Sequence, residues 1–271
     1  MRWLLVLLLC GCNQIYGLKE TGQQDAAFFD APADAPYACP AIGVTPQFSP
    51  QLTQFLVQRC EAYSVVRSGR AVARCKDDNG TDRVFVGNID ERLEPAIGVD
   101  MIGPVLPRLT QDGEHLIVRE PTKIAVVQVH VYDRQSDGTW LRGGDPPFGS
   151  HIRAIGTLSD DNRMLVTTSD DVLLHEWIFE GTTWRQVGTQ MPSVPSVSDV
   201  LFAASLTEDG LRVVATVNNR ALYSDRATVS DPFRAFVALE GAPRGVDMTL
   251  NADCSRLYAA GLGSVFYANP R

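Results

Sequence analysis

The chain has 271 residues, of which 45% are hydrophobic and 21% are charged. This composition is typical of a globular protein and excludes a disordered, collagen-like or coiled-coil chain. The formal net charge of −8 argues against a general nucleic-acid binder, because such proteins need excess positive charge to displace phosphate counterions. We therefore expect no nucleic-acid partner. The length allows either one or two domains.

The N-terminus has the pattern of a cleaved export signal. Arg2 supplies one positive charge, and an unbroken apolar run extends from Trp3 to Leu9. Because this run is too short to cross about 30 Å of hydrocarbon, a permanent transmembrane helix is not expected. We assign residues 1–11 to a signal peptide.

The segment Leu9-Cys10-Gly11-Cys12 resembles a bacterial lipobox, in which leucine, a tolerant position and glycine precede the modified cysteine. The resemblance implies that Cys12 becomes the first mature residue and carries a diacylglycerol and an N-acyl chain. Each buried CH₂ of such chains contributes about 0.8 kcal/mol, so the protein would be anchored to the membrane. Asn13 after the cysteine favours the outer membrane of the cell envelope, on its periplasmic or surface face. The alternative is a secreted protein cleaved slightly later.

Residues 12–51 are expected to form a flexible tether rich in proline, alanine and aspartate. Five prolines fall in its second half: Pro32, Pro36, Pro40, Pro46 and Pro50. Such a segment buries too little apolar surface to order itself, and proline keeps the chain extended. We expect the tether to hold a folded domain, residues 52–271, away from the lipid surface.

Four segments of that domain share one pattern: a leucine, a small polar residue, a variable residue, an aspartate, a turn and a β-rich run. The segments begin at Leu109, Leu158, Leu206 and Leu250. Their period of about 44 to 49 residues, with several short strands per unit, is the signature of a β-propeller. Aspartate suits a tight hairpin because it accepts local backbone hydrogen bonds, so we interpret the recurring aspartate as a turn residue, not as a metal ligand or an acid. These aspartates are Asp112, Asp161, Asp209 and Asp253.

A fifth, degenerate unit precedes these four. Its strands are predicted at residues 63–67, 71–75, 83–87 and 93–97. The last unit stops after its third strand, whereas residues 52–58 form an orphan strand. We therefore predict an all-β propeller of five blades, each with four antiparallel strands, in which this N-terminal strand completes the final blade and closes the ring. Closure protects two sheet edges that would otherwise invite aggregation.

The repeated motifs resemble the propeller repeats of the TolB-type and WD-like families over residues 60–271. The resemblance implies the fold and leaves the function open, because propeller repeats serve enzymes and scaffolds alike. The family pattern has proline at the variable position of the motif. This chain has Gln111, Asp160, Glu208 and Ala252 there.

Four cysteines lie beyond the signal region, and an even number in an exported protein indicates two disulfides. Three pairings are open in principle. The five-bladed arrangement favours Cys60–Cys75, because Cys60 enters the first hairpin where Cys75 leaves it. Cys39 would then pair with Cys254 and staple the tether to the last blade. Zinc binding is the rival interpretation, but no Cys-x-x-Cys pair occurs and we predict no metal site.

No catalytic signature accompanies the predicted fold. The histidines lack the spacing that places two imidazoles on one metal, and neither a nucleophile elbow nor a Walker loop occurs. His151, Asp199 and Asp247 are candidates for lining the central channel, where a water-filled polar lining is the simpler interpretation. We expect no cofactor.

The predicted function is that of a monomeric, lipid-anchored envelope module that binds an unknown protein or glycan without catalysis. The alternative is a carbohydrate-active hydrolase, which needs two carboxylates about 5 to 10 Å apart near the central channel. The sequence identifies neither the partner nor a reaction.

Overall fold

The computed structural model describes the chain from Cys39 to Arg271, within a compact unit that spans residues 37–271. Short gaps interrupt the described part at residues 57–58, 89–90, 102, 104, 122–126, 150, 170–172, 196–201, 219, 243–246, 252 and 262–263. The predicted signal peptide, Cys12 and most of the predicted tether lie outside it. Among the described residues, no helix has the length and apolar character needed to span a bilayer.

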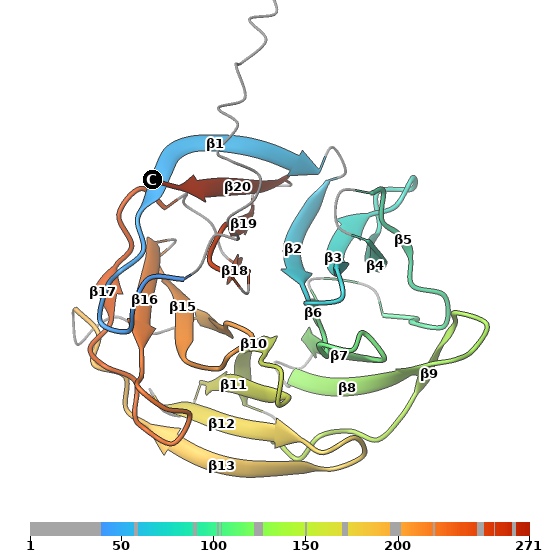
Figure 1. Cartoon of the computed structure of the whole chain (residues 1–271). Helices are drawn as coiled ribbons and strands as arrows, with labels where there is room; N and C mark the ends of the chain where they lie inside the picture. The colour runs from blue at the N-terminus through green and yellow to red at the C-terminus, as the bar shows by residue number, and fades with distance from the viewer. Residues whose placement is uncertain are drawn as a thin grey trace, which may run out of the picture. The chain divides into compact units, whose positions relative to one another are not determined.

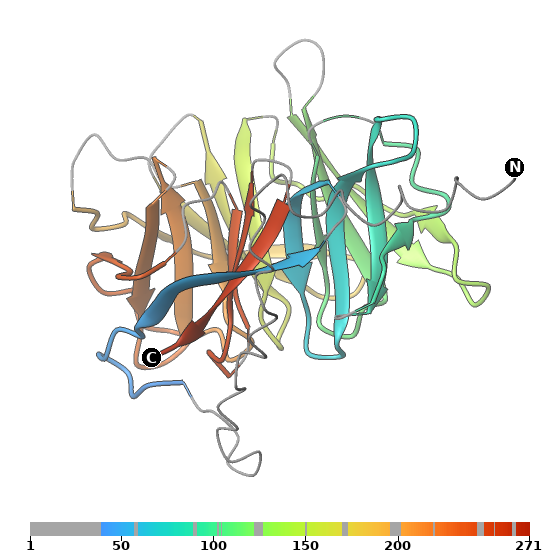
Figure 2. The same cartoon turned by 90° about the horizontal axis from the view of Figure 1, so that it is seen from above.

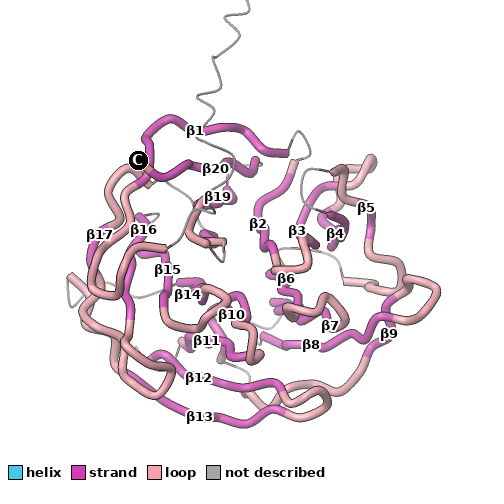
Figure 3. Tube along the Cα trace, viewed as in Figure 1, coloured by secondary structure: helices cyan, strands magenta, loops and turns pink. Residues whose placement is uncertain are grey.

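The described strands form five antiparallel sheets of four strands, arranged as blades around a central axis (Figures 1 and 3). The first blade contains, from the axis outward, β2 (Cys60–Val65), β3 (Arg70–Lys76), β4 (Asp82–Asn88) and β5 (Glu94–Pro95). The second contains β6 (Leu106–Leu109), β7 (His115–Pro121), β8 (Val127–Arg134) and β9 (Trp140–Arg142). The third contains β10 (Ile152–Leu158), β11 (Arg163–Thr168), β12 (Leu174–Phe179) and β13 (Trp184–Gln190).

The fourth blade contains β14 (Phe202–Leu206), β15 (Arg212–Val217), β16 (Arg220–Asp225) and β17 (Val237–Ala238). The fifth contains β18 (Asp247–Leu250), β19 (Leu257–Gly261), β20 (Ser264–Pro270) and, outermost, β1 (Phe48–Leu56). The first strand of the chain thus completes the blade that holds its last strands, as the blue and red arrows in Figure 2 show. The predicted five-bladed propeller is confirmed. The closing strand begins at Phe48, before the predicted range 52–58.

Burial explains the strand composition. Each sheet packs between neighbouring blades, so its second strand is covered on both faces and is buried continuously rather than at alternate residues. All six residues of β15, Arg-Val-Val-Ala-Thr-Val, are buried. The outer strand β13 is instead polar and partly exposed along its length.

Five hairpins join the innermost strand of each blade to its second strand, and they lie together at one end of the ring. We call this end the hairpin face. One residue in each hairpin has a positive φ, which glycine and asparagine tolerate best. These residues are Gly69, Gly113, Asn162, Gly210 and Cys254. The recurring aspartates accept hydrogen bonds within the same hairpins, for example from the N–H of Leu211 to Asp209, in keeping with a turn role.

Two disulfides lie in the first and fifth blades, at the point where the two ends of the ring meet. Cys60 and Cys75 join the first two strands of the first blade, at the end of the ring opposite the hairpin face. Cys39 and Cys254 join the N-terminal segment to the hairpin of the fifth blade. These are the pairings that the five-bladed arrangement favours.

Candidate functional site: an axial funnel on the hairpin face

One buried ion pair closes the axis of the ring. The side chains of Arg108 on β6 and Asp247 on β18 are both 0% exposed, and their two pairs of atoms lie 2.6 and 2.9 Å apart. Nε of Arg108 also donates to the carbonyl of Ile155 on β10, and Asp247 accepts the backbone N–H of Tyr63 on β2. The pair therefore links the innermost strands of four blades.

The structure does not bring the three candidate channel residues together in its described part. Asp247 lies on the axis, but both of its carboxylate oxygens are bound to Arg108. His151 is exposed and precedes β10 at the end of the ring opposite the hairpin face, where its carbonyl accepts the N–H of Ser169. Asp199 lies outside the described residues.

Toward the hairpin face, the axis opens into a funnel of about 290 Å³. Every blade contributes to its wall. In blade order, the lining includes Arg67, Gln111, Thr157, Glu208 and Asp253.

The variable position of the repeated motif forms a ring at this funnel. The innermost strands pair with the second strands in equivalent register, and they end at Val65, Leu109, Leu158, Leu206 and Leu250. The residue two positions further along is therefore equivalent in all blades. These residues are Arg67, Gln111, Asp160, Glu208 and Ala252, the last of which lies outside the described part.

The four described members of this ring contact one another although they come from different blades. The N–H of Arg67 donates to Oε1 of Gln111 at 2.9 Å, and its guanidinium lies 2.8 Å from Oδ2 of Asp160. The N–H of Asp160 donates to the carbonyl of Glu208 at 2.7 Å. Nε of Arg67 lies 3.9 Å from Oε2 of Glu208. The hairpins are thus tied to each other across the mouth of the funnel.

The pKa of Glu208 is raised from its ordinary value of 4.5 to about 7. Burial of the carboxyl group is the largest cause, and the negative charge of Asp160 is the next. Arg67 opposes the rise, whereas Asp253 and Asp209 add to it. The Glu208 carboxyl is therefore about half protonated near neutral pH.

A second polar layer lies below the ring. It consists of the residue before the end of each innermost strand, and all five are buried: Ser64, Arg108, Thr157, Ser205 and Thr249. Arg108 reaches Asp247 from this layer. The hydroxyls of Thr157 and Thr249 donate to carbonyls of the neighbouring blades, at 2.8 and 3.2 Å.

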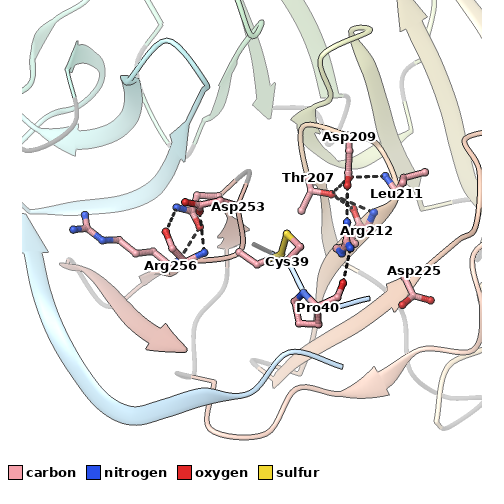
Figure 4. Close-up of a disulfide and its surroundings, with 12 residues drawn as sticks. Cys39, Pro40, Thr207, Asp209, Leu211, Arg212, Asp225, Asp253 and Arg256 are labelled. Atoms are coloured by element: carbon pink, nitrogen blue, oxygen red, sulfur yellow. Dashed lines mark hydrogen bonds and ion pairs between the residues drawn. A yellow bond between two sulfur atoms is a disulfide. The ribbon is translucent and has the colours of Figure 1, made fainter. Parts of the chain in front are cut away.

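The N-terminal segment is fastened beside the funnel. Cys39 is bound to Cys254, the residue after the funnel-lining Asp253 (Figure 4). A covalent bond therefore fixes Cys39, the first described residue, at the hairpin face.

The segment that follows crosses the fourth blade before it enters β1. Nη2 of Arg212 donates to the carbonyl of Pro40 at 2.7 Å (Figure 4), and the N–H of Gly43 donates to Oδ2 of Asp225 at 2.6 Å. Arg212 and Asp225 are themselves paired partners at the ends of β15 and β16. Residues 39–47 of the predicted tether thus have fixed contacts with the domain.

The funnel ring is not among the predicted site residues, because its motif position has no constant residue type. The signal that could have found it is the recurrence of polar residues at this position, Gln111, Asp160 and Glu208. Arg108 is not among them either, although a single arginine in the otherwise apolar strand Leu-Pro-Arg-Leu marks a buried charge that needs a partner.

No protein-family model matches this chain, and no curated protein matches its sequence. Solved structures do resemble it. A gluconolactonase from Xanthomonas campestris aligns at 10% identity with a TM-score of 0.51, over 78% of this chain and 72% of its own. The fold is a five-bladed β-propeller. At this identity the likeness to the gluconolactonase concerns the fold alone.

Two further solved propellers resemble the chain at lower scores. The WD40 repeats of RRP9 align at 10% identity with a TM-score of 0.44, over 84% of this chain and 99% of theirs. The protein U3-55K aligns at 9% identity with a TM-score of 0.45, over 83% and 99%.

Proposed function

We propose that this protein is a lipid-anchored module of the cell envelope that binds a protein or glycan partner without catalysis, through the axial funnel. The funnel itself is the observation that supports the site. All five blades line it, and the ring at its mouth is built from polar residues at a motif position where related repeats have proline. If these residues only formed the hairpin turns, they would not need to be charged at the axis.

Anchoring rests on the lipobox-like sequence that ends at Cys12 and on the staple at Cys39. The residues between these cysteines could extend about 3.3 to 3.6 Å each, so a bound partner would stay within about 100 Å of the membrane. Because the spacer joins the hairpin face, the funnel mouth lies at the end of the domain to which the anchor is attached.

Palmitate labelling in cells tests whether the protein is lipid-anchored. We expect palmitate to label the wild-type protein, processing to be blocked by globomycin, and the Cys12→Ser variant to escape both. A wild-type protein that is neither labelled nor globomycin-sensitive would contradict anchoring.

Capture of a binding partner from envelope fractions tests whether the funnel is the binding site. Asp253 is exposed at its mouth, so Asp253→Arg reverses a charge there. The substitution also removes the acceptor of the Ser255 N–H in the hairpin, so calorimetry first checks that the variant unfolds as the wild type does. We expect the wild type to retain a partner that Asp253→Arg loses. Glu240, an exposed carboxylate after β17, serves as the matched control, and Glu240→Arg should retain the partner. Equal capture by all three proteins would place the binding site elsewhere.

A carbohydrate-active hydrolase is the second candidate, and the raised pKa of Glu208 is the observation that favours it. A carboxyl group that is half protonated near neutral pH has the property required of a general acid. Both carboxylate oxygens of Asp247, in contrast, are bound to Arg108.

A screen for hydrolysis of polysaccharides decides between the binding function and the hydrolase function. The screen compares the wild type with Glu208→Gln and with the double variant Asp199→Asn, Asp247→Asn. Hydrolysis by the wild type would overturn the non-catalytic proposal, and its loss in Glu208→Gln would assign the acid to Glu208. Equal activity of the double variant would exclude Asp199 and Asp247 as the acids. Absence of hydrolysis, together with capture that depends on Asp253, would support it.

A further inference from the structure

Residues 39–45, which we call the strap, cross the fourth blade before the chain enters β1. Cys39, the first residue of the strap, is bonded to Cys254 in the hairpin of the fifth blade (Figure 4). The strap buries little of its own surface: Gly43 and Val44 are exposed, and Cys39 is partly exposed. A segment with few buried contacts has low local stability. The disulfide is therefore a covalent restraint on a segment that is otherwise weakly held.

Two hydrogen bonds join the strap to the fourth blade. Nη2 of Arg212 donates to the carbonyl of Pro40 at 2.7 Å, and the N–H of Gly43 donates to Oδ2 of Asp225 at 2.6 Å. The side chains of Arg212 and Asp225 are only 8% and 4% exposed. The strap thus covers a donor and an acceptor of the fourth blade with its own backbone groups.

The cysteine in the fifth hairpin stands where the other hairpins have glycine or asparagine. Cys254 has a φ of 60°, and the residues at positive φ in the other four hairpins are Gly69, Gly113, Asn162 and Gly210. A positive φ costs a non-glycine residue free energy, and residues held in this way concentrate at functional positions. Glycine would meet the requirement of the turn at lower cost, so the cysteine is explained by the bond that it makes.

The two disulfides differ in their surroundings. Cys60 and Cys75 are paired residues of the neighbouring strands β2 and β3, and both are 0% exposed within an apolar cluster. Cys39, in contrast, precedes the first strand and is partly exposed. Thiol–disulfide exchange requires access to a sulfur, and exposed disulfides are the labile ones. A reductant should therefore react with Cys39–Cys254 first.

From these observations we propose that Cys39–Cys254 is a redox latch that holds the strap on the fourth blade. A thiolate of a dithiol reductant attacks Sγ of Cys39, the bond between the two sulfurs breaks, and Cys254 leaves as a thiolate that takes up a proton. The second thiolate of the reductant then displaces Cys39. The reductant ends as a disulfide and the protein as two thiols, and an oxidised dithiol reverses both steps.

Opening of the latch releases the strap and leaves the ring closed. Two hydrogen bonds alone would then hold the strap, and its departure uncovers Nη2 of Arg212 and Oδ2 of Asp225 on the hairpin face. The hairpin of Cys254 keeps its own bonds, such as that from the N–H of Cys254 to the carbonyl of Asn251. Arg212 also keeps its ion pair with Asp209. This regulation does not depend on what the funnel binds.

Reduction of the purified protein with increasing dithiothreitol tests the latch, with alkylation and mass spectrometry to follow each cysteine. We expect Cys39 and Cys254 to be alkylated at a dithiothreitol concentration at least about tenfold lower than Cys60 and Cys75. At that concentration, the amide of Gly43 should exchange its hydrogen at least about tenfold faster in NMR experiments, because its bond to the fourth blade is lost. The amide chemical shifts of the second blade should not change.

Two double variants complete the test. Cys39→Ser, Cys254→Ser should show the fast exchange at Gly43 without reductant, whereas Cys60→Ser, Cys75→Ser should keep the slow exchange until reductant is added. Reduction of both disulfides at one concentration would overturn the latch, as would unchanged exchange at Gly43 after reduction of Cys39–Cys254. Unfolding of the ring at that concentration, seen as a loss of dispersion in the amide shifts, would also overturn it, because the disulfide would then hold the whole fold.

Discussion

At the scale of single residues, the axis is held by charges that only tertiary contacts can satisfy. Arg108 and Asp247 lie 139 residues apart in sequence, and the local hydrogen bond of Arg108 goes to the neutral carbonyl of Pro107. Each charge is buried at a desolvation cost that the other offsets. The pair therefore fixes how the innermost strands of the ring meet.

Breaking this pair should be costly. Arg108→Met leaves the Asp247 carboxylate buried and uncompensated, so we expect the free energy of unfolding to fall by about 3–5 kcal/mol in urea denaturation. The double variant Arg108→Met, Asp247→Leu removes both charges and should recover much of that loss. A single variant as stable as the wild type would show that the pair does not hold the axis.

Glu208 should make stability depend on pH in a defined direction. Its pKa is about 7 in the folded protein and about 4.5 when unfolded, so the folded state holds the proton more tightly. Its contribution to stability is therefore full below about pH 4.5 and is lost as the pH rises through 7. Glu208→Gln should raise Tm relative to the wild type at pH 8 and have little effect at pH 5. Equal effects at both pH values would contradict the shift, and Glu240→Gln gives the baseline.

At the scale of elements, the sequence repeat alone predicts most of the fold. The leucine and aspartate of each motif mark the end of an innermost strand and its hairpin, which gives four blades, and the degenerate first unit gives the fifth. The outer strands are less predictable. In the fourth blade the outer strand β17 covers Val237–Ala238 alone. Phe233, which precedes it, packs under Arg226, and its N–H donates to Gln190 of the neighbouring blade, a contact that the local sequence pattern does not show.

The same limit applies to the candidate site. The residues of the funnel ring occupy the same motif position but differ in type, so a search for one residue type at that position does not identify them. Contacts such as Arg67 with Asp160 join hairpins of the first and third blades. Opposite charges from different blades come together across the axis in the folded ring, and the linear sequence does not show this proximity.

The two disulfides should differ in their effect on stability. Reducing the entropy of the unfolded chain stabilises more when the closed loop is longer. Loss of Cys60–Cys75, which closes a separation of 15 residues, should cost about 3 kcal/mol. Loss of Cys39–Cys254, with a separation of 215, should cost about 5 kcal/mol. Denaturant unfolding of the two double-serine variants checks the order, and a larger loss from Cys60–Cys75 would contradict it.

The closing strand should be essential for a cooperative ring. Deletion of residues 48–56 removes β1, uncovers the edge of β20 and takes the buried Phe48 out of the core. We expect broad unfolding at lower temperature and aggregation, seen by calorimetry and size-exclusion chromatography. Near-native, cooperative unfolding of the deletion variant would show that the ring closes without β1.

At the scale of the whole molecule, the funnel and the Cys39–Cys254 disulfide lie at the same face of the domain. The disulfide adjoins the funnel-lining Asp253, so Cys39, the first described residue, lies beside the funnel mouth. Under the proposed function, a partner in the funnel is held near the point of anchoring. Under the same proposal, the net negative charge of the chain would keep the domain off an anionic membrane.

Photo-crosslinking in cells tests the central proposal, that the funnel is the binding site, most directly. A benzophenone amino acid is placed at Asp253, on the funnel mouth, and in a second strain at Glu240, outside the funnel lining; both side chains are exposed. We predict a discrete crosslinked adduct in the envelope fraction from position 253 and none from position 240. An adduct from position 240 with none from position 253 would contradict the proposal.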